Sequence, residues 1–247
     1  MKIIISPAKK MNSLGSELGE TTEPVFQERA EYLRSRLQAM SLQQLKELWR
    51  CSDRLAEENF RRLQEYEPGV CLTPALLAYE GIQYQYMAPQ VFTQRQWEYC
   101  CGHLRILSGL YGILRPMDGV IPYRLEMQAK LSGEGYANLY EFWGSALYGT
   151  LAQPGEWILN LASKEYSQAV EKYRTPDVPF ITCVFGEFAD GKVKTKATLA
   201  KMARGEMVRF LAERVITRPE QIREFTGLGF VFDEKRSCGE TLTFVKP

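Results

Sequence analysis

Short apolar strands and helical stretches follow one another along this chain without any regular repeat. Apolar runs bounded by turn residues predict strands, and these lie at residues 3–5, 157–161, 179–188, 193–195, 230–232 and 241–245. Apolar spacings of three and four predict helices, and these lie within residues 24–66 and at 74–79, 93–107, 138–151 and 198–215. A doubly wound sheet would need successive strand–helix–strand units, so we predict an α+β fold with a compact mixed sheet and packing helices.

The least regular part of the chain is residues 107–127, LSGLYGILRPMDGVIPYRLEM. Gly109 and Gly112 allow a positive φ or a close approach of another group, and Arg115 and Arg124 bracket a turn rich in proline and glycine. Two interpretations are open. The segment is either a structured loop whose arginines pair with neighbouring carboxylates, or a loop that binds an anion.

Composition excludes several classes of protein. With 45% hydrophobic and 25% charged residues, the chain has the make-up of an ordinary globular protein. Its net charge of +1 gives no general attraction to nucleic acid or to an anionic membrane, so such a partner would need a local patch. The N-terminal apolar run is too short for a signal peptide, and no stretch is apolar enough to span a membrane. We therefore expect a cytoplasmic location and no membrane partner.

Metal and cofactor chemistry is not expected. The chain has one histidine, His103, which excludes a histidine-rich zinc or iron site. Its six cysteines show no CxxC spacing, so we predict reduced and mostly buried thiols at Cys51, Cys71, Cys100, Cys101, Cys183 and Cys238.

Positive charge is concentrated in residues 192–218. Eight basic residues face only Glu206 and Glu213 there, and the basic ones are Lys192, Lys194, Lys196, Lys201, Arg204, Arg209, Arg214 and Arg218. Their local net charge is +6. This segment is either an exposed surface balanced by acids elsewhere or a site for phosphate groups, which arginine side chains and exposed backbone N–H groups bind well.

Seven blocks in order along the chain resemble the YaaA family, the bacterial peroxide-stress resistance proteins. The blocks are SPAK at 6–9, LSGLYGILRP at 107–116, PYRLEM at 122–127, FWG at 142–144, NLASKEY at 160–166, ARG at 203–205 with Met207 and Arg209, and FDE at 232–234. Together they span nearly the whole chain, which makes the resemblance specific.

The resemblance implies a cytoplasmic protein that helps cells survive hydrogen peroxide by limiting intracellular free iron and oxidative DNA damage. It also implies one domain over residues 1–247, with a helix-hairpin-helix-like element and a positively charged cleft that binds double-stranded DNA. We map the hairpin to residues 107–112 and the helix that enters it to residues 97–106. No cofactor and no protein partner is indicated.

The predicted DNA contacts combine the hairpin with the basic side chains. They are Gly109, Leu110, Gly112, Arg115, Arg124, Lys201, Arg204 and Arg209. We expect binding without strong sequence preference, because no helix offers Asn, Gln and Arg together to a major groove.

A competing hypothesis is an enzyme that acts on a nucleotide or another phosphate-bearing ligand. Polar groups near the ends of predicted strands would form its site, namely Lys9, Arg124, Glu126, Asn160, Ser163, Lys164, Glu165 and Tyr166. Glu126 or Tyr166 would act as acid or base, while Lys9 and Lys164 would bind a phosphate or activate a nucleophile. A structural network of ion pairs would have the same composition, and no sequence motif specifies a reaction, so this hypothesis ranks second.

Overall fold

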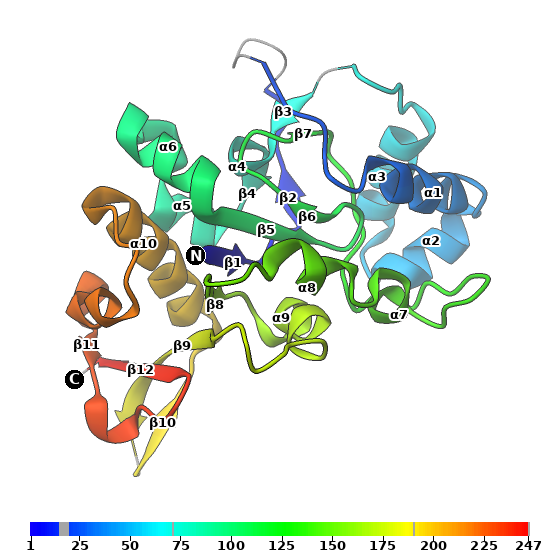
Figure 1. Ribbon diagram of the computed structural model, residues 1–247. Coiled ribbons are helices and arrows are strands. Elements are labelled where there is room, and N and C mark those ends of the chain that lie inside the picture. The colour runs from blue at the N-terminus through cyan, green and yellow to red at the C-terminus, as the bar shows by residue number, and fades with distance from the viewer. Residues whose placement is uncertain (15–19, 71, 190, 247) are drawn as a thin grey trace.

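A mixed β-sheet with parallel central strands organises the structure (Figure 1). The computed structural model describes residues 1–14, 20–70, 72–189 and 191–246. The strand order is β11-β12-β9-β8-β1-β5-β6, with β10 paired to β9. Strands β12, β9, β8, β1 and β5 are parallel to their neighbours in this series, whereas β6, β10 and β11 pair antiparallel. The strands are β1 (Lys2–Ile5), β5 (Leu104–Ser108), β6 (Gly112–Leu114), β8 (Ile158–Leu161), β9 (Phe180–Ala189), β10 (Lys192–Lys194), β11 (Val231–Phe232) and β12 (Thr241–Lys246).

Two short antiparallel pairs lie beyond the main sheet. They join β2 (Lys10–Met11) to β4 (Tyr79–Glu80), and β3 (Thr73–Pro74) to β7 (Gly119–Val120). The first pair ties the chain that leaves β1 to the segment that precedes α5 (Ile82–Met87). Both segments therefore reach the same end of the sheet.

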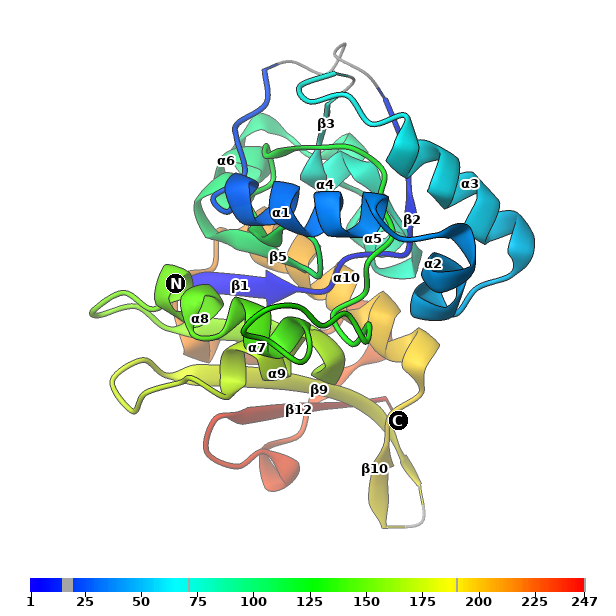
Figure 2. The ribbon, with the colours of Figure 1, turned by 90° about the vertical axis from the view of Figure 1, so that its right-hand side faces the viewer.

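Helices lie on both sides of the central strands, as Figure 1 and Figure 2 show. On one side α10 (Ala197–Arg214) packs against α5 and α6 (Gln94–His103). On the other side lie α7 (Leu139–Trp143), α8 (Ala146–Leu151) and α9 (Lys164–Glu171). The remaining helices are α1 (Gln27–Gln38), α2 (Leu42–Trp49), α3 (Asp53–Gln64) and α4 (Ala75–Ala78), with short 3-10 turns at Pro89–Val91, Pro219–Glu224, Gly227–Gly229 and Glu234–Arg236. The predicted α+β class is confirmed.

Local signals located several elements correctly. Ser41 with Gln44 and Thr93 with Gln96 form the two capping boxes that start α2 and α6, because each pair satisfies backbone N–H groups that a helix start leaves free. The helix expected over residues 138–151 is divided into α7 and α8 at Gly144, whose φ is +51°. A positive φ cannot continue a right-handed helix.

The predicted helix-hairpin-helix is wrong. Helix α6 ends at His103, and residues 104–114 form a β-hairpin of β5 and β6 rather than the end of a helix. Leu104, Ile106 and Leu107 are fully buried, since β5 lies between β1 and β6 within the sheet. A short apolar run of this kind fits a doubly buried strand as well as a helix, and only the neighbouring strands decide between them.

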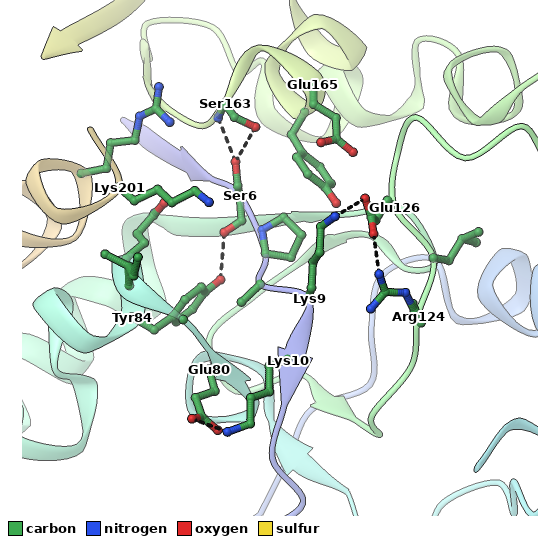
Figure 3. A pocket seen from close by; sticks show the side chains of 18 of the residues that line it. Ser6, Lys9, Lys10, Glu80, Tyr84, Arg124, Glu126, Ser163, Glu165 and Lys201 are labelled. Carbon is green, nitrogen blue, oxygen red and sulfur yellow. Dashed lines mark hydrogen bonds and ion pairs between the residues drawn. The ribbon is translucent and has the colours of Figure 1, made fainter. Parts of the chain in front are cut away.

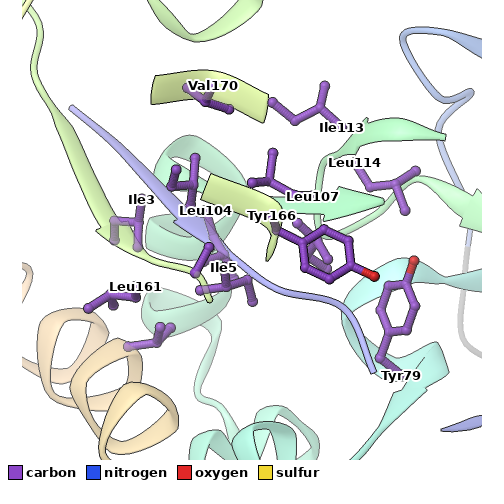
Figure 4. Packing of buried hydrophobic residues seen from close by; sticks show 14 of the residues in the cluster. Ile3, Ile5, Tyr79, Leu104, Leu107, Ile113, Leu114, Leu161, Tyr166 and Val170 are labelled. Carbon is purple, nitrogen blue, oxygen red and sulfur yellow. The ribbon is translucent and has the colours of Figure 1, made fainter. Parts of the chain in front are cut away.

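The core continues from the sheet into the helices that flank it. Figure 4 shows Ile3 and Ile5 of β1 packed with Leu104 and Leu107 of β5, and Tyr166 of α9 reaches the same cluster. Central parallel strands are apolar on both faces because helices cover both faces. The ends of these strands are therefore where polar side chains can reach a solvent-accessible site.

Candidate functional site

A cavity of about 410 Å³ opens at the carboxyl end of β1 (Figure 3). Its lining comes from segments that are far apart in the sequence, namely residues 6–10, 80–84, 123–126, 163, 165–166, 201 and 204. In sheets with parallel strands, ligand sites form outside the carboxyl ends of the strands. The cavity has this position and a size within the range of small-molecule sites.

Ser6 and Ser163 connect two neighbouring strands at the base of the cavity. Because β1 and β8 are parallel and Ile5 is opposite Leu161, the residues that follow them meet. Ser6 Oγ accepts a hydrogen bond from the Ser163 backbone N–H at 2.8 Å and lies 3.1 Å from Ser163 Oγ. The Tyr84 hydroxyl donates to the Ser6 carbonyl oxygen at 3.0 Å. Burial raises the pKa of Tyr84 well above its usual value, so this hydroxyl remains a donor.

One side of the cavity carries paired charges. Glu126 contacts Lys9 Nζ at 2.9 Å and an Arg124 guanidinium nitrogen at 3.3 Å. Glu165 lies nearby and accepts a long hydrogen bond from the Gln128 backbone N–H at 3.4 Å. Burial raises the pKa of Glu165, and the negative charge of Glu126 raises it further, while Lys9 opposes them. Two carboxyl groups in different surroundings therefore share this side.

The other side carries two cations without an ion-pair partner among the described residues. Lys201 and Arg204 line the cavity from α10, and neither forms a salt bridge with any described residue. Figure 3 shows Lys201 reaching from α10 into the cavity. Burial lowers the pKa of Arg204, and its Nε is closed off from solvent without a hydrogen-bond partner. We call Lys201 and Arg204 the cationic wall.

Gln83 adds a second unsatisfied donor to the cavity lining. Its side chain is only 6% exposed, and its Nε2 has no hydrogen-bond partner. Gln83 and the cationic wall are held together by the packing of α5 on α10. Gly205 makes this packing possible, because a Cβ there would meet the Gln83 carbonyl oxygen at 2.1 Å.

The predicted basic cleft is only partly assembled. Arg124, Lys201 and Arg204 all line the cavity. Arg209 is five residues beyond Arg204 on α10, about 140° around the helix at 100° per residue, and it pairs with Glu213 at 2.8 Å. Arg115 follows β6, which runs antiparallel to β5, and it pairs with the fully buried Asp118 at 2.8 Å. Arg115 and Arg209 are therefore not part of this lining.

The turn between β5 and β6 faces the interior. Gly109 and Gly112 are buried and Leu110 is 1% exposed, so the predicted phosphate contacts of this turn are not available at the surface. A Cβ at Gly109 would meet the Leu125 carbonyl oxygen at 2.3 Å. The glycine thus lets the segment that carries Arg124 and Glu126 pass close to the turn.

Of the two interpretations of the basic segment 192–218, each fits some of its residues. Lys196 pairs with Glu187 at 2.6 Å, and Arg214 pairs with Glu224 at 2.9 Å, as Arg209 does with Glu213. These side chains are an exposed surface balanced by acids. Lys201 and Arg204 instead face a concave site.

The residues of the enzyme hypothesis are also only partly together. Lys9, Glu126 and Tyr166 line the cavity. Lys164 is outside the lining, exposed and paired with Glu171. Asn160 is buried in β8 and accepts from the Ala162 backbone N–H at 2.9 Å, which is a structural role. A catalytic role for any of these groups stays a prediction.

Sequence reasoning missed Gln83, Tyr84 and Tyr123, which line the cavity. Residues 80–84 enter the site because β4 pairs with β2, the short strand that begins directly after Lys9. No local sequence pattern predicts this pairing. The small residue Gly205 in a long helix is the one local sign of a close helix contact.

Other sequence expectations concern metals and thiols. No group of three His, Cys, Asp or Glu suited to a metal ion occurs within the described residues. His103 is outside the cavity lining, and its Nδ1 lies 3.0 Å from the Met1 carbonyl oxygen.

The described cysteines are free thiols, as predicted. Fewer of them are buried than predicted, because among the described cysteines only Cys100 and Cys183 are buried. Cys71 lies outside the described residues. In the described part of the chain, no helix has the length and apolar character needed to cross a membrane.

Comparison with known proteins places this chain among close relatives. A UPF0246 protein of Desulfitobacterium hafniense is 52% identical over 246 residues, which cover 100% of this chain and 98% of the relative. A UPF0246 protein of Lactiplantibacillus plantarum is 51% identical over 245 residues, 99% of each chain. The family model described as peroxide stress protein YaaA matches residues 1–236. The chain therefore belongs to the YaaA family of peroxide stress proteins, the family that its seven sequence blocks predicted.

Proposed function

We propose that this peroxide stress protein binds double-stranded DNA through the sugar–phosphate backbone, without strong sequence preference, and so limits oxidative damage in the cytoplasm. The observation that supports the proposal best is the cationic wall of Lys201 and Arg204, which no described carboxylate neutralises. Arginine and lysine side chains supply most of the contacts to DNA phosphates. Arg204 is half-buried, and an unpaired guanidinium in such a position favours an anion beside it.

The expected footprint on DNA is small. Lys196, Arg209 and Arg214 pair with acids, and Lys9 on the opposite side of the cavity pairs with Glu126, so the cationic wall offers about two contacts to phosphate groups. Each bound phosphate contributes about 0.9 to the magnitude of the slope of log affinity against log salt, so we expect a slope of about 2. Binding of this kind reads no bases, which agrees with the absence of a recognition motif in the sequence.

In cells, we expect the protein to lower the level of intracellular free iron. Iron that reacts with peroxide damages DNA, so protection and iron should change together. The test compares free iron and survival under peroxide in cells that carry the wild-type gene, no gene, or the variant Lys201→Glu. Equal free iron in all three strains would remove iron from the proposal.

The binding test is fluorescence anisotropy of a labelled duplex of arbitrary sequence, titrated at several salt concentrations. Lys201→Glu should weaken binding at least tenfold and lower the salt slope by about one for each phosphate group that the variant no longer binds. Lys192→Glu is the matched control, because it makes the same charge change at an exposed position of the same basic segment, in β10. Equal weakening by both variants, or none by Lys201→Glu, would contradict the proposed site.

A further inference from the structure

Two hydrogen-bond donors are buried without partners at one end of the cavity. They are Nε of Arg204 and Nε2 of Gln83, which belong to different helices, α10 and α5. Buried donors are nearly always satisfied in folded proteins, so such a pair calls for an explanation. Both residues line the cavity. The two donor atoms themselves are closed off from solvent, so a bound group meets the cavity-facing parts of these side chains, such as the terminal guanidinium nitrogens of Arg204.

The packing of the two helices holds these donors in place. Gly205, the residue after Arg204, touches the backbone of Gln83, and no larger residue fits between them. The contact fixes the main chain from which both side chains extend. They are presented by a rigid helix contact, which is how proteins prepare a binding site in advance.

The surroundings of the donors favour a negative group with several acceptor oxygens. Lys201 contributes a second cation, and no described carboxylate pairs with it or with Arg204. Ser163 is the N-cap residue of α9, without a capping side-chain hydrogen bond, and it also lines the cavity, so the positive end of that helix dipole lies beside the same space. A phosphate group accepts hydrogen bonds only and matches two cations better than a carboxylate does.

The opposite side of the cavity has a different chemistry. Glu126 and Glu165 are carboxyl groups that suit a hydroxyl or an amino group, and the exposed Lys9 pairs with Glu126. A volume of about 410 Å³ has room for a nucleotide-sized molecule, whereas a DNA duplex can touch only the rim, where Lys201 is exposed.

We infer that the cavity binds a phosphomonoester of about nucleotide size, with its phosphate at Arg204, Lys201 and Gln83 and its hydroxyl or amino groups toward Glu126 and Glu165. The phosphate has two sources, a free mononucleotide or the phosphorylated end of a DNA strand. The inference shares the cationic wall with the proposed function, but it concerns the interior of the cavity and holds even if duplex DNA does not bind.

Calorimetric titration of the full chain tests the inference with adenosine 5′-monophosphate, inorganic phosphate and adenosine. We expect the monophosphate to bind at least tenfold more tightly than adenosine, with inorganic phosphate as a competitor. Duplexes whose strand ends carry either a 5′-phosphate or a 5′-hydroxyl form the second arm. Preference for the phosphorylated end alone identifies DNA as the source, whereas preference for the mononucleotide identifies a small ligand.

Two variants test whether Arg204 and Gln83 bind the phosphate group. Arg204→Met keeps an unbranched apolar stem without the charge, and Gln83→Leu keeps a side chain of similar size without the amide. Each should weaken monophosphate binding at least tenfold, and without ligand Arg204→Met should have an unchanged or higher Tm because an unpaired half-buried cation is removed. Arg209→Met on the same helix is the control, since Arg209 pairs with Glu213 outside the cavity.

The inference is overturned if neither the monophosphate nor a 5′-phosphorylated end binds better than its phosphate-free counterpart. It is also overturned if Arg204→Met and Gln83→Leu bind the monophosphate as the wild type does. A covalently closed duplex without strand ends separates the two proposals. Its binding tests the proposed function alone, because it contains no phosphomonoester.

Discussion

Gly205 of α10 lies directly against the main chain of Gln83, so closely that a Cβ on the glycine would meet the Gln83 carbonyl oxygen at 2.1 Å. This contact brings Arg204 beside Gln83 and so forms one end of the cavity. A backbone atom cannot move aside as a flexible side chain can. The glycine therefore determines how closely α5 and α10 approach.

Gly205→Ala should destabilise the protein, because the added methyl group forces the two helices apart. Overpacking of this kind lowers the free energy of unfolding by about 1–3 kcal/mol. Urea unfolding followed by circular dichroism measures the change. Gly149→Ala in α8 is the matched control, because nothing lies within 4 Å of its Cβ position and alanine favours a helix by about 0.5–1 kcal/mol. Equal stability of the two variants would contradict the close contact.

Glu165→Gln should change how stability depends on pH. Burial and the charge of Glu126 raise the pKa of Glu165 above its ordinary value of 4.5, so between that pH and the raised pKa the folded state binds more protons than the unfolded state. Stability contributed by this group is present at low pH and is lost as pH rises through that window. Glutamine has no such titration.

The free energy of unfolding of wild type and variant, measured by urea titration from pH 4 to 8, checks this sign. The Glu165→Gln variant should gain on the wild type as pH rises above 4.5, and the difference should level off once Glu165 is ionised. The same substitution at the exposed Glu134 is the control. A difference that shrinks with rising pH would show that the carboxylate is stabilised where it lies.

Tyr123→Phe should break a chain of hydroxyl groups behind the cavity. The Tyr123 hydroxyl lies 2.7 Å from that of Tyr79 and 2.6 Å from Ser108 Oγ. Without it, the buried Tyr79 hydroxyl loses its partner, and the free energy of unfolding should fall by about 1–3 kcal/mol. Urea unfolding measures the loss. Tyr86→Phe, which removes a hydroxyl outside this chain, should leave stability within about 0.5 kcal/mol, and an equal loss in both variants would refute the assignment.

Signals that act within a few residues were read correctly from the sequence. The two capping boxes, the first strand and the long basic helix all depend on neighbouring residues, and all are present near the predicted positions. The polar group at the end of the first strand was also expected, and Lys9, Glu126 and Tyr166 do line one cavity. The seven ordered blocks identified the family.

The sequence pattern predicts the wrong structure where contacts between residues distant in sequence determine the secondary structure or the exposure of a segment. Residues 104–108 are a strand because β1 lies beside them, and their own apolar pattern fits a helix equally well. The glycines at 109 and 112 suggested exposed phosphate contacts, yet Gly109 serves the close passage of Leu125.

By itself, the sequence determined the family, the α+β class and the residue types available for chemistry, because these depend on local order and composition. Only the tertiary structure decided which cations stay unpaired. Arg209 pairs with Glu213, one helical turn away on α10. Arg204 instead lies on the side of α10 that lines the cavity, next to the close contact of Gly205 with Gln83 of α5. No described carboxylate pairs with Arg204 there. Whether a charge is paired depends on distances in space. Folding brings together residues that are far apart along the chain, and their sequence positions do not predict that they will meet.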